Sequence, residues 1–247
     1  MSDCKIIEKE NVLPALILGA SLVIAVIIGG IFVKSIRNSS NTLTSTGSAK
    51  MHVVSDSAKF SGSVVAYGTQ IQLPSRYQEI DTNTAKVKAY LLEKGATEEE
   101  ISIAPVTLIE QYNYSSNSAN EPKQYQLNQV ITVNSTDVKL VTDIADGISE
   151  IAKKGVLFQT NGAQYLYSKL ADLRISLLGD AIKDAKARVG EIAKASSAKV
   201  GNLKSATSGV VQVLAQNSID TSDYGTYDTS TIEKDVMVTV RATFVIK

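Results

Sequence analysis

The chain has 247 residues, with 25 Lys or Arg and 25 Asp or Glu, so its formal net charge at pH 7 is zero. Binding to the phosphate backbone of nucleic acid requires clustered Lys and Arg, and this balanced composition argues against it. The one cysteine, Cys4, excludes an intrachain disulfide, and the one histidine, His52, excludes a multi-histidine metal site.

The stretch Asn11–Val33 is apolar and has no charged residue between Glu10 and Lys34. A helix over this stretch would be about 33 Å long, enough to cross a hydrocarbon core of about 30 Å. The stretch is too long for the apolar region of a cleaved signal peptide, and no Ala-x-Ala site follows it. We therefore expect three N-terminal segments: a short tail over 1–11, an uncleaved transmembrane helix over 12–33 and a polar linker over 34–42.

Small side chains recur at helical spacing within the predicted span, which would let neighbouring spans pack closely. They are Ala15, Gly19, Ser21, Ala25 and Gly29. A simple lipid-facing anchor explains them equally well. Because basic residues flank both ends of the span, the charge distribution does not indicate its orientation.

Beyond the linker, residues 43–247 alternate between strand-like and helix-like patterns. Alternating apolar residues predict strands, and apolar residues three and four apart predict helices that end before Gly95 and Gly155. The longest helix has a narrow, alanine-rich apolar seam suited to close approach to a sheet. The predicted strands are 43–54, 57–68, 101–114, 124–134, 155–168, 201–215 and 232–246, and the predicted helices are 74–94, 138–154 and 172–197.

This order of elements predicts an α+β fold, in which amphipathic helices cover one face of antiparallel sheets. The hairpin formed by 101–114 and 124–134 has a polar tip. Tyrosines near this tip offer an amphipathic surface suited to a protein interface, although tyrosines that only cap the hairpin fit the pattern as well. These candidate interface residues are Tyr112, Tyr114 and Tyr125.

No group of residues predicts a catalytic, cofactor or metal site, or a small-molecule substrate. Asp180 and Asp184 lie on one helical face, but the neighbouring basic residues indicate a solvated surface. A polar segment over 216–231 contains three aspartates that lack the spacing of an EF-hand: Asp220, Asp223 and Asp228. His52 fits best as an exposed or partly buried strand residue.

The order of several short blocks resembles that of SIMPL-domain proteins over residues 43–247. The segment STGSAKMHVVSDSAKFS resembles the family's Gly-containing strand and Pro-Asp-x-Ala step, with matches at Gly47, Asp56 and Ala58. Ser55 replaces the proline of that step. The segment LLEKGATEEEISIAPVTLIEQYNY resembles the family's helix end at Gly95, with Glu100 where Asp is common.

The resemblance implies a bacterial extracytoplasmic domain, in the periplasm or at the cell surface, whose relatives assemble into ring-like homo-oligomers. It implies no established reaction, and it implies an orientation with the large domain outside the cytoplasm and a cytoplasmic tail over 1–11. We therefore expect a non-enzymatic, membrane-anchored scaffold of the cell envelope, with membrane lipid and further copies of the chain as its partners. An envelope stress-related ligand-binding or sensing module is the alternative, and a hydrolase or redox enzyme is the remaining class.

Overall fold

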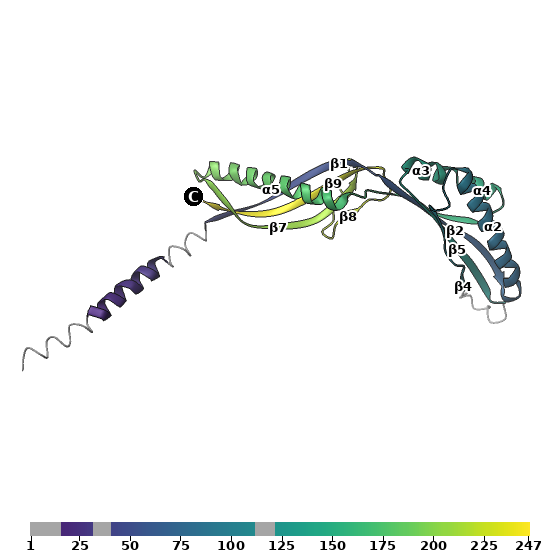
Figure 1. Cartoon of the computed structure of the whole chain (residues 1–247), viewed down its shortest axis with the longest axis horizontal. Coiled ribbons are helices and arrows are strands. Elements are labelled where there is room, and N and C mark those ends of the chain that lie inside the picture. Colours follow the sequence, from purple (N-terminus) through teal and green to yellow (C-terminus); the bar gives the residue numbers. More distant parts are fainter. Residues whose placement is uncertain (1–15, 32–40, 112–121) are drawn as a thin grey trace, which may run out of the picture. The chain divides into compact units, whose positions relative to one another are not determined.

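The computed structural model describes residues 16–31, 41–111 and 122–247. After a helix over 16–31, the elements are β1 (Thr42–Val54), β2 (Ser57–Thr69), η1 (Gln70–Gln72), α2 (Leu73–Glu93), β3 (Ile101–Ile103), β4 (Thr107–Gln111), β5 (Gln124–Ser135), α3 (Val138–Gly147), α4 (Ser149–Lys153), β6 (Phe158–Leu166), α5 (Leu170–Ala195), β7 (Val200–Ala215), β8 (Thr226–Tyr227) and β9 (Glu233–Ile246) (Figure 1).

The chain forms two compact units, and β1, β7, β9 and α5 contribute residues to both. The first unit contains residues up to Ala49 together with Leu178–Gly209 and Thr239–Lys247. The second unit contains Lys50–Leu177 and Val210–Val238.

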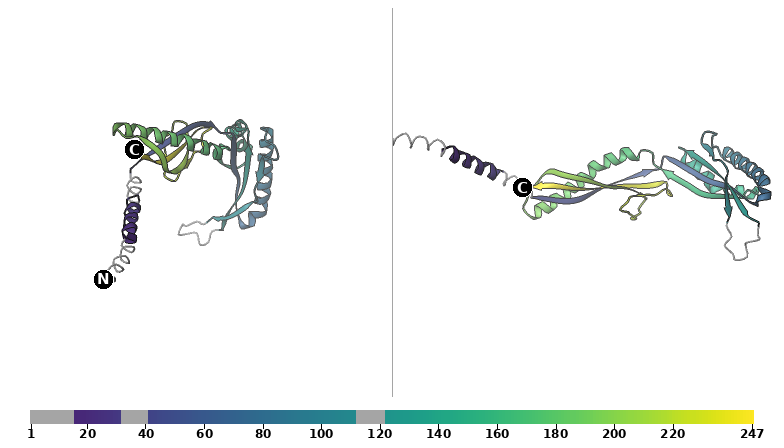
Figure 2. Two further views of the ribbon diagram at one scale, coloured as in Figure 1. Left: turned by 60° about the vertical axis from the view of Figure 1, so that its left-hand side comes forward. Right: turned by 90° about the horizontal axis from the view of Figure 1, so that it is seen from below.

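In the first unit, α5 lies along one face of the sheet (Figures 1 and 2). Gly47 of β1 lies against the helix backbone, because a Cβ atom at this position would overlap backbone atoms of Ala181 and Ala185. The alanine-rich seam therefore packs closely on the sheet, as its sequence predicts. Ile192, which also fits the seam, is instead 48% exposed. The buried core of this unit is Ala181, Ala185, Val189, Val240, Ala242 and Phe244.

The strand order β1-β9-β7-β8 places β9 between β1 and β7. At the β1 side, the Ile246 N–H donates to the Asn41 carbonyl at 3.0 Å, and the hydroxyls of Thr44 and Thr243 lie 2.9 Å apart. Residue numbers that rise along β1 fall along β9, so these strands are antiparallel.

At the β7 side, Lys199 and Lys247 exchange two backbone hydrogen bonds of 2.7 and 2.9 Å. Gly201 then lies against Val245, so β7 is also antiparallel to β9. It follows that β1 and β7 run in the same direction on either side of β9.

The second unit contains a five-stranded antiparallel sheet in the order β3-β5-β2-β6, with β4 also paired to β5. The register of β2 on β5 runs from Ala58↔Ser135 to Thr69↔Gln124. Helices α2, α3 and α4 pack against this sheet (Figure 1). The apolar face predicted for α2 is the buried one, and it consists of Ile80, Thr84, Val87 and Leu91.

The predicted end of α2 at Gly95 is confirmed. Gly95 has φ of +105°, a conformation that residues with a side chain rarely adopt. The Gly95 N–H donates to the Leu92 carbonyl, and the Ala96 N–H donates to the Leu91 carbonyl, both at 3.0 Å. This Schellman arrangement satisfies carbonyls that the helix end would otherwise leave unpaired.

The α+β class with antiparallel sheets is confirmed, but some elements differ from their predicted extent. The strand predicted over 101–114 is interrupted around Pro105, which has no N–H to donate to a ladder. The helix predicted over 138–154 divides at Ile148. The polar segment over 216–231 contains β8, which pairs in parallel with β7.

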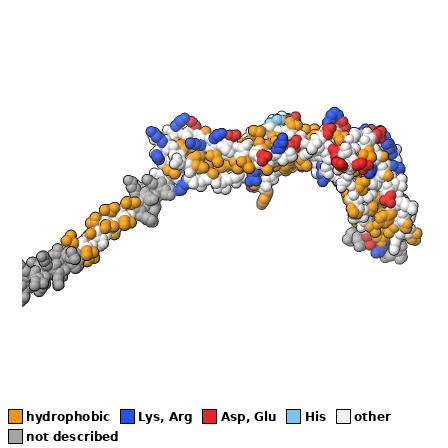
Figure 3. Space-filling model, in the orientation of Figure 1, with side chains coloured by type: hydrophobic (Ala, Val, Ile, Leu, Met, Phe, Trp, Pro, Cys, Tyr) orange, Lys and Arg blue, Asp and Glu red, His pale blue; other side chains and the backbone are white. Residues whose placement is uncertain are grey.

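The helix over 16–31 belongs to the stretch predicted to span a membrane. Its residues, which include Gly19, Ala25 and Gly29, are exposed. Figure 3 shows hydrophobic side chains over the visible face of this helix. Within the described residues, no helix combines the length and apolar character needed to cross a membrane. Residues 12–15 and 32–33 of the predicted span, including Ala15, lie outside the described residues. The anchor stays a prediction.

Candidate functional site

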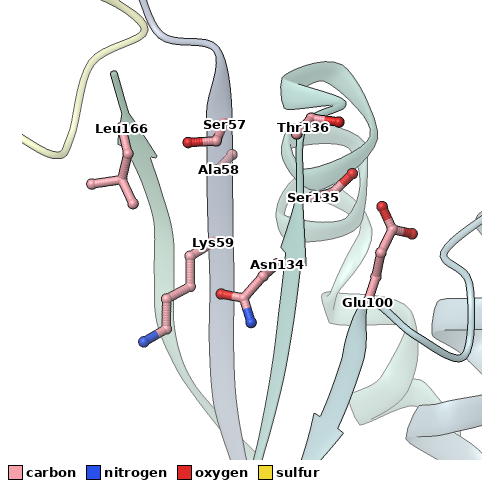
Figure 4. A pocket seen from close by; sticks show the side chains of 8 residues that line it. All are labelled: Ser57, Ala58, Lys59, Glu100, Asn134, Ser135, Thr136 and Leu166. Atoms are coloured by element: carbon pink, nitrogen blue, oxygen red, sulfur yellow. The ribbon is translucent and has the colours of Figure 1, made fainter. Parts of the chain in front are cut away.

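A pocket of about 400 Å³ lies in the second unit, where β2 begins and β5 ends (Figure 4). Lys59 and Asn134 are cross-strand partners, so their side chains leave the same face of the sheet. The Asn134 amide lies between Lys59 and Glu100 (Figure 4). The pocket is lined by Ser57, Ala58, Lys59, Glu100, Asn134, Ser135, Thr136 and Leu166.

This pocket brings together a cationic and an anionic side chain. Lys59 is half-buried and makes no ion pair with any residue that the structure describes. Glu100 accepts hydrogen bonds from the N–H and the hydroxyl of Thr97 at 2.9 and 3.0 Å. A side-chain hydrogen bond with Ser135, together with the Thr97 bonds, holds the pKa of Glu100 below its ordinary value. Such a mixture of charges and hydroxyls can bind a small polar molecule.

Asp56 joins the start of β2 to the segment before α5. Its two carboxylate oxygens accept from the N–H and the hydroxyl of Ser168, both at 2.7 Å. Burial raises the pKa of Asp56, but the Ser168 hydrogen bonds outweigh it and leave the pKa below the ordinary value. Ser55, which replaces the family's proline, donates its N–H and its hydroxyl to the Ile232 carbonyl, both at 2.9 Å. A proline could make neither bond.

His52 lies in a network of polar side chains between β1 and β9 of the second unit. Its Nε2 is 2.5 Å from Glu233, and its Nδ1 is 3.3 Å from Asp235. Asp235 is buried and also accepts from Lys50 at 2.7 Å and from the Asn217 N–H at 3.0 Å. The Lys50 bond leads the contacts that outweigh burial and hold the pKa of Asp235 below its ordinary value.

The two carboxylates considered as a pair on one helical face, Asp180 and Asp184, have structural partners. Asp180 pairs with Lys183, and Asp184 accepts from Arg188 and from the Ser48 N–H. Across the ranges that the structure describes, no group of three His, Cys, Asp or Glu residues is arranged to hold a metal ion.

Asp228, from the polar segment, holds a buried lysine. Lys234 is 0% exposed, and its ammonium donates to the carbonyls of Asp228 and Thr231 at 2.6 and 2.5 Å. It also lies 3.4 Å from the Asp228 carboxylate. Burial lowers the pKa of Lys234, and the contacts with Asp228 oppose that effect. The sequence pattern gave no indication of this pair.

The residues that match the family pattern contribute to the fold. Gly47 permits the close helix contact, Asp56 holds Ser168, and Gly95 ends α2. Ala58 is 2% exposed in the core of the second unit.

Among the tyrosines predicted as an interface, only Tyr125 is described. It is half-buried on β5 and lies opposite Gly68 of β2 and Glu110 of β4. Tyr112 and Tyr114 lie outside the described residues, so the interface prediction for the hairpin tip stays untested.

A feature that the sequence analysis missed is the exposed edge of the first unit. Residues 202–210 of β7 are exposed on both faces, and β8 pairs with β7 only at Gln212 and Val213. β1 forms the opposite edge of the same sheet. The sequence carries one signal of these edges, because 42–49 and 205–211 contain no charged residue and no proline.

These observations define an α+β protein with two sheets, each packed against helices, and with exposed strand edges. The chain belongs to the SIMPL family, whose model, described as a protein of unknown function (DUF541), matches residues 43–244. No curated protein matches the chain.

Proposed function

We propose that this chain is a membrane-anchored, extracytoplasmic scaffold of the cell envelope that self-assembles into a ring-like homo-oligomer. The observation that carries the proposal is the exposed edge of β7, which has no charged residue from Ser205 to Val211. Natural proteins protect such edges with charges, prolines or bulges, because an unprotected edge pairs with another chain. The resemblance to ring-forming SIMPL proteins supports the ring-like arrangement, and the apolar stretch Asn11–Val33 supports the anchor. The proposal involves no catalytic step.

Assembly is tested by multi-angle light scattering of the full-length chain in detergent. We expect a multimer whose mass falls in the variant Ala206→Lys, because this variant adds a charge to the exposed part of β7. The matched control is Ala171→Lys, which adds the same charge at an exposed position of α5. A wild-type chain that is monomeric over a wide concentration range would overturn the proposal.

The anchor and its orientation are tested by cysteine labelling in spheroplasts. A membrane-impermeant maleimide should label Ser230→Cys in a Cys4→Ser background and should leave Cys4 of the wild type unlabelled until the membrane is opened. The reverse pattern would overturn the orientation, and extraction of the chain by alkaline carbonate would overturn the anchor.

The pocket around Lys59 and Glu100 favours a second function, an envelope stress-related ligand-binding module. Ligand binding to the native state alone raises the unfolding temperature. A panel of amino acids and small carboxylates should then stabilise the wild type and not Lys59→Met, with Lys169→Met as the control. If no compound stabilises the wild type, this second function is contradicted.

A further inference from the structure

The hydrogen bonds of β1 show which backbone groups point out of the sheet. Asn41 directs its carbonyl to Ile246 of β9. Because successive residues of a strand direct their N–H and C=O groups to opposite sides, the groups of Thr42, Thr44 and Thr46 point away from β9.

Ser48 follows the same alternation, and its outward N–H is already occupied. It donates to the Asp184 carboxylate of α5 at 2.8 Å. Because the N–H of Ser48 already has this partner, the part of the β1 edge that is free to pair with another strand ends before Ser48. Within the described residues, the backbone of the first part of β1, Thr42–Thr46, has no neighbouring strand on its outer side.

The same argument applies to β7. Lys199 exchanges both hydrogen bonds with Lys247 and therefore faces β9. The outward groups of β7 are then those of Asn202, Lys204 and Ala206, in the run that is exposed on both faces. The open edge of β7 ends at Gln212, where β8 begins to pair.

Helix coverage also differs between the two edges. α5 lies over β1 through the contact of Gly47 with Ala185. At the other edge, Val200 packs against the core under α5, but the side chains from Asn202 onward are exposed. Helix α5 therefore covers β1 but leaves most of β7 uncovered on the same face of the sheet.

The geometry points to a specific contact between copies, in which the β1 edge of one copy, Thr42–Thr46, pairs in parallel with the β7 edge of the next copy, 202–208. β1 and β7 run in the same direction, so a neighbour in the same orientation presents β1 to β7 as a parallel strand. Its α5, which travels with β1, then lies beside the uncovered side of β7. This inference rests on the proposed self-assembly and adds which strands meet.

A head-to-tail contact is favoured over a symmetric one by the number of edges that it covers. Pairing of two β7 strands would close a dimer and leave both β1 edges open. Head-to-tail pairing occupies the β1 and β7 edges of every copy, and it closes into a ring when the rotation between copies permits. Neither edge contains a proline that would oppose the contact, and the charged residue among Thr42–Thr46 and 202–208 is Lys204 of β7.

Cross-linking of engineered cysteines tests the contact in the full-length chain. Cys4→Ser removes the native thiol, so every cross-link then comes from an introduced cysteine. Thr44→Cys and Ser205→Cys suit the test because both side chains lie on the sheet face opposite α5, given that Gly47 and Val200 face the helix. A flexible bismaleimide tolerates a small shift in register.

The double variant should give a ladder of multimers in denaturing gels, because each chain links to two neighbours. A mixture of the two single variants should give dimers, and each single variant alone should remain monomeric. Dimers of Ser205→Cys alone would mean that β7 meets β7, which overturns the inference. Multimers in light scattering without cross-links in the double variant would also overturn it while leaving self-assembly intact. Monomers in light scattering would overturn the self-assembly itself.

Discussion

Gly47 of β1 lies so close to Ala185 of α5 that a Cβ atom at Gly47 would come within 2.8 Å of the Ala185 Cα. This contact brings the helix down onto the strand and allows Asp184 to accept the hydrogen bond from the Ser48 N–H. The contact between Gly47 and Ala185 thus determines how α5 packs on the first unit. It also determines how many residues of the β1 edge remain without a hydrogen-bond partner on their outer side.

We predict that Gly47→Ala destabilises the protein by about 1–3 kcal/mol or more, because the added methyl group overpacks a rigid backbone contact. Urea denaturation measures the change in the free energy of unfolding. Gly179→Ala is the matched control, since nothing lies within 4 Å of a Cβ atom there and Ala is a better helix former than Gly. Equal stability of Gly47→Ala and wild type would contradict the packing described for α5.

Gly95→Ala should lower the free energy of unfolding by about 1–2 kcal/mol, because an L-residue at positive φ is strained. Thermal unfolding followed by circular dichroism would show the loss. Gly190→Ala provides the comparison, because this glycine lies in α5 and a Cβ atom there would also meet open space. If Gly95→Ala and Gly190→Ala change the free energy of unfolding equally, strain at the positive φ of Gly95 does not explain the effect.

Asp235→Asn should destabilise the protein at neutral pH by about 1.5–3 kcal/mol, because the charged hydrogen bond to Lys50 is lost. The pKa of Asp235 is depressed in the folded state, so its contribution is fully present above the unfolded pKa of about 4. That contribution is lost as the pH falls through the folded pKa, and the two stability curves should converge in acid. Asp223→Asn, at an exposed position, should show no such pH-dependent difference.

Lys234→Met should cost about 3–5 kcal/mol of stability, because it leaves the partners of a buried ammonium unpaired. The double variant Lys234→Met with Asp228→Asn should cost less than the sum of the two single changes, which a double-mutant cycle in urea would measure. Lys183→Met, at a side chain that is 81% exposed, is the control. Additive effects would show that Asp228 and Lys234 do not interact.

Local patterns predicted the buried faces well because they reflect the repeat of a single element. Val238 and Val240 alternate with exposed or half-buried neighbours along β9, and they are 0% and 2% exposed. Asp137 caps the start of α3 in the same local way, since its side chain accepts from the Leu140 N–H. These features depend on residues within one or two turns of each other, which a sequence shows directly.

The pocket and the ion networks were not predictable in this way. Lys59 and Asn134 are far apart in the chain, and only the register of β2 on β5 makes them neighbours. Likewise, His52 reaches Asp235 only through the pairing of β1 with β9. Such contacts arise from strand pairing across long sequence separations, and neither residue of a pair carries a local signal of its partner.

The sequence by itself determined the α+β class, the apolar faces of the helices and of β9, the stop at Gly95 and the resemblance to the SIMPL family. Tertiary structure alone decided that β1 and the first part of β7 lie at the edges of their sheet, and that Asp184 accepts the outward N–H of Ser48 at one end of the β1 edge. The physical reason is that an edge is defined by the absence of a neighbouring strand. Whether a neighbour exists depends on how the whole sheet is ordered, and the composition of the strand does not encode it.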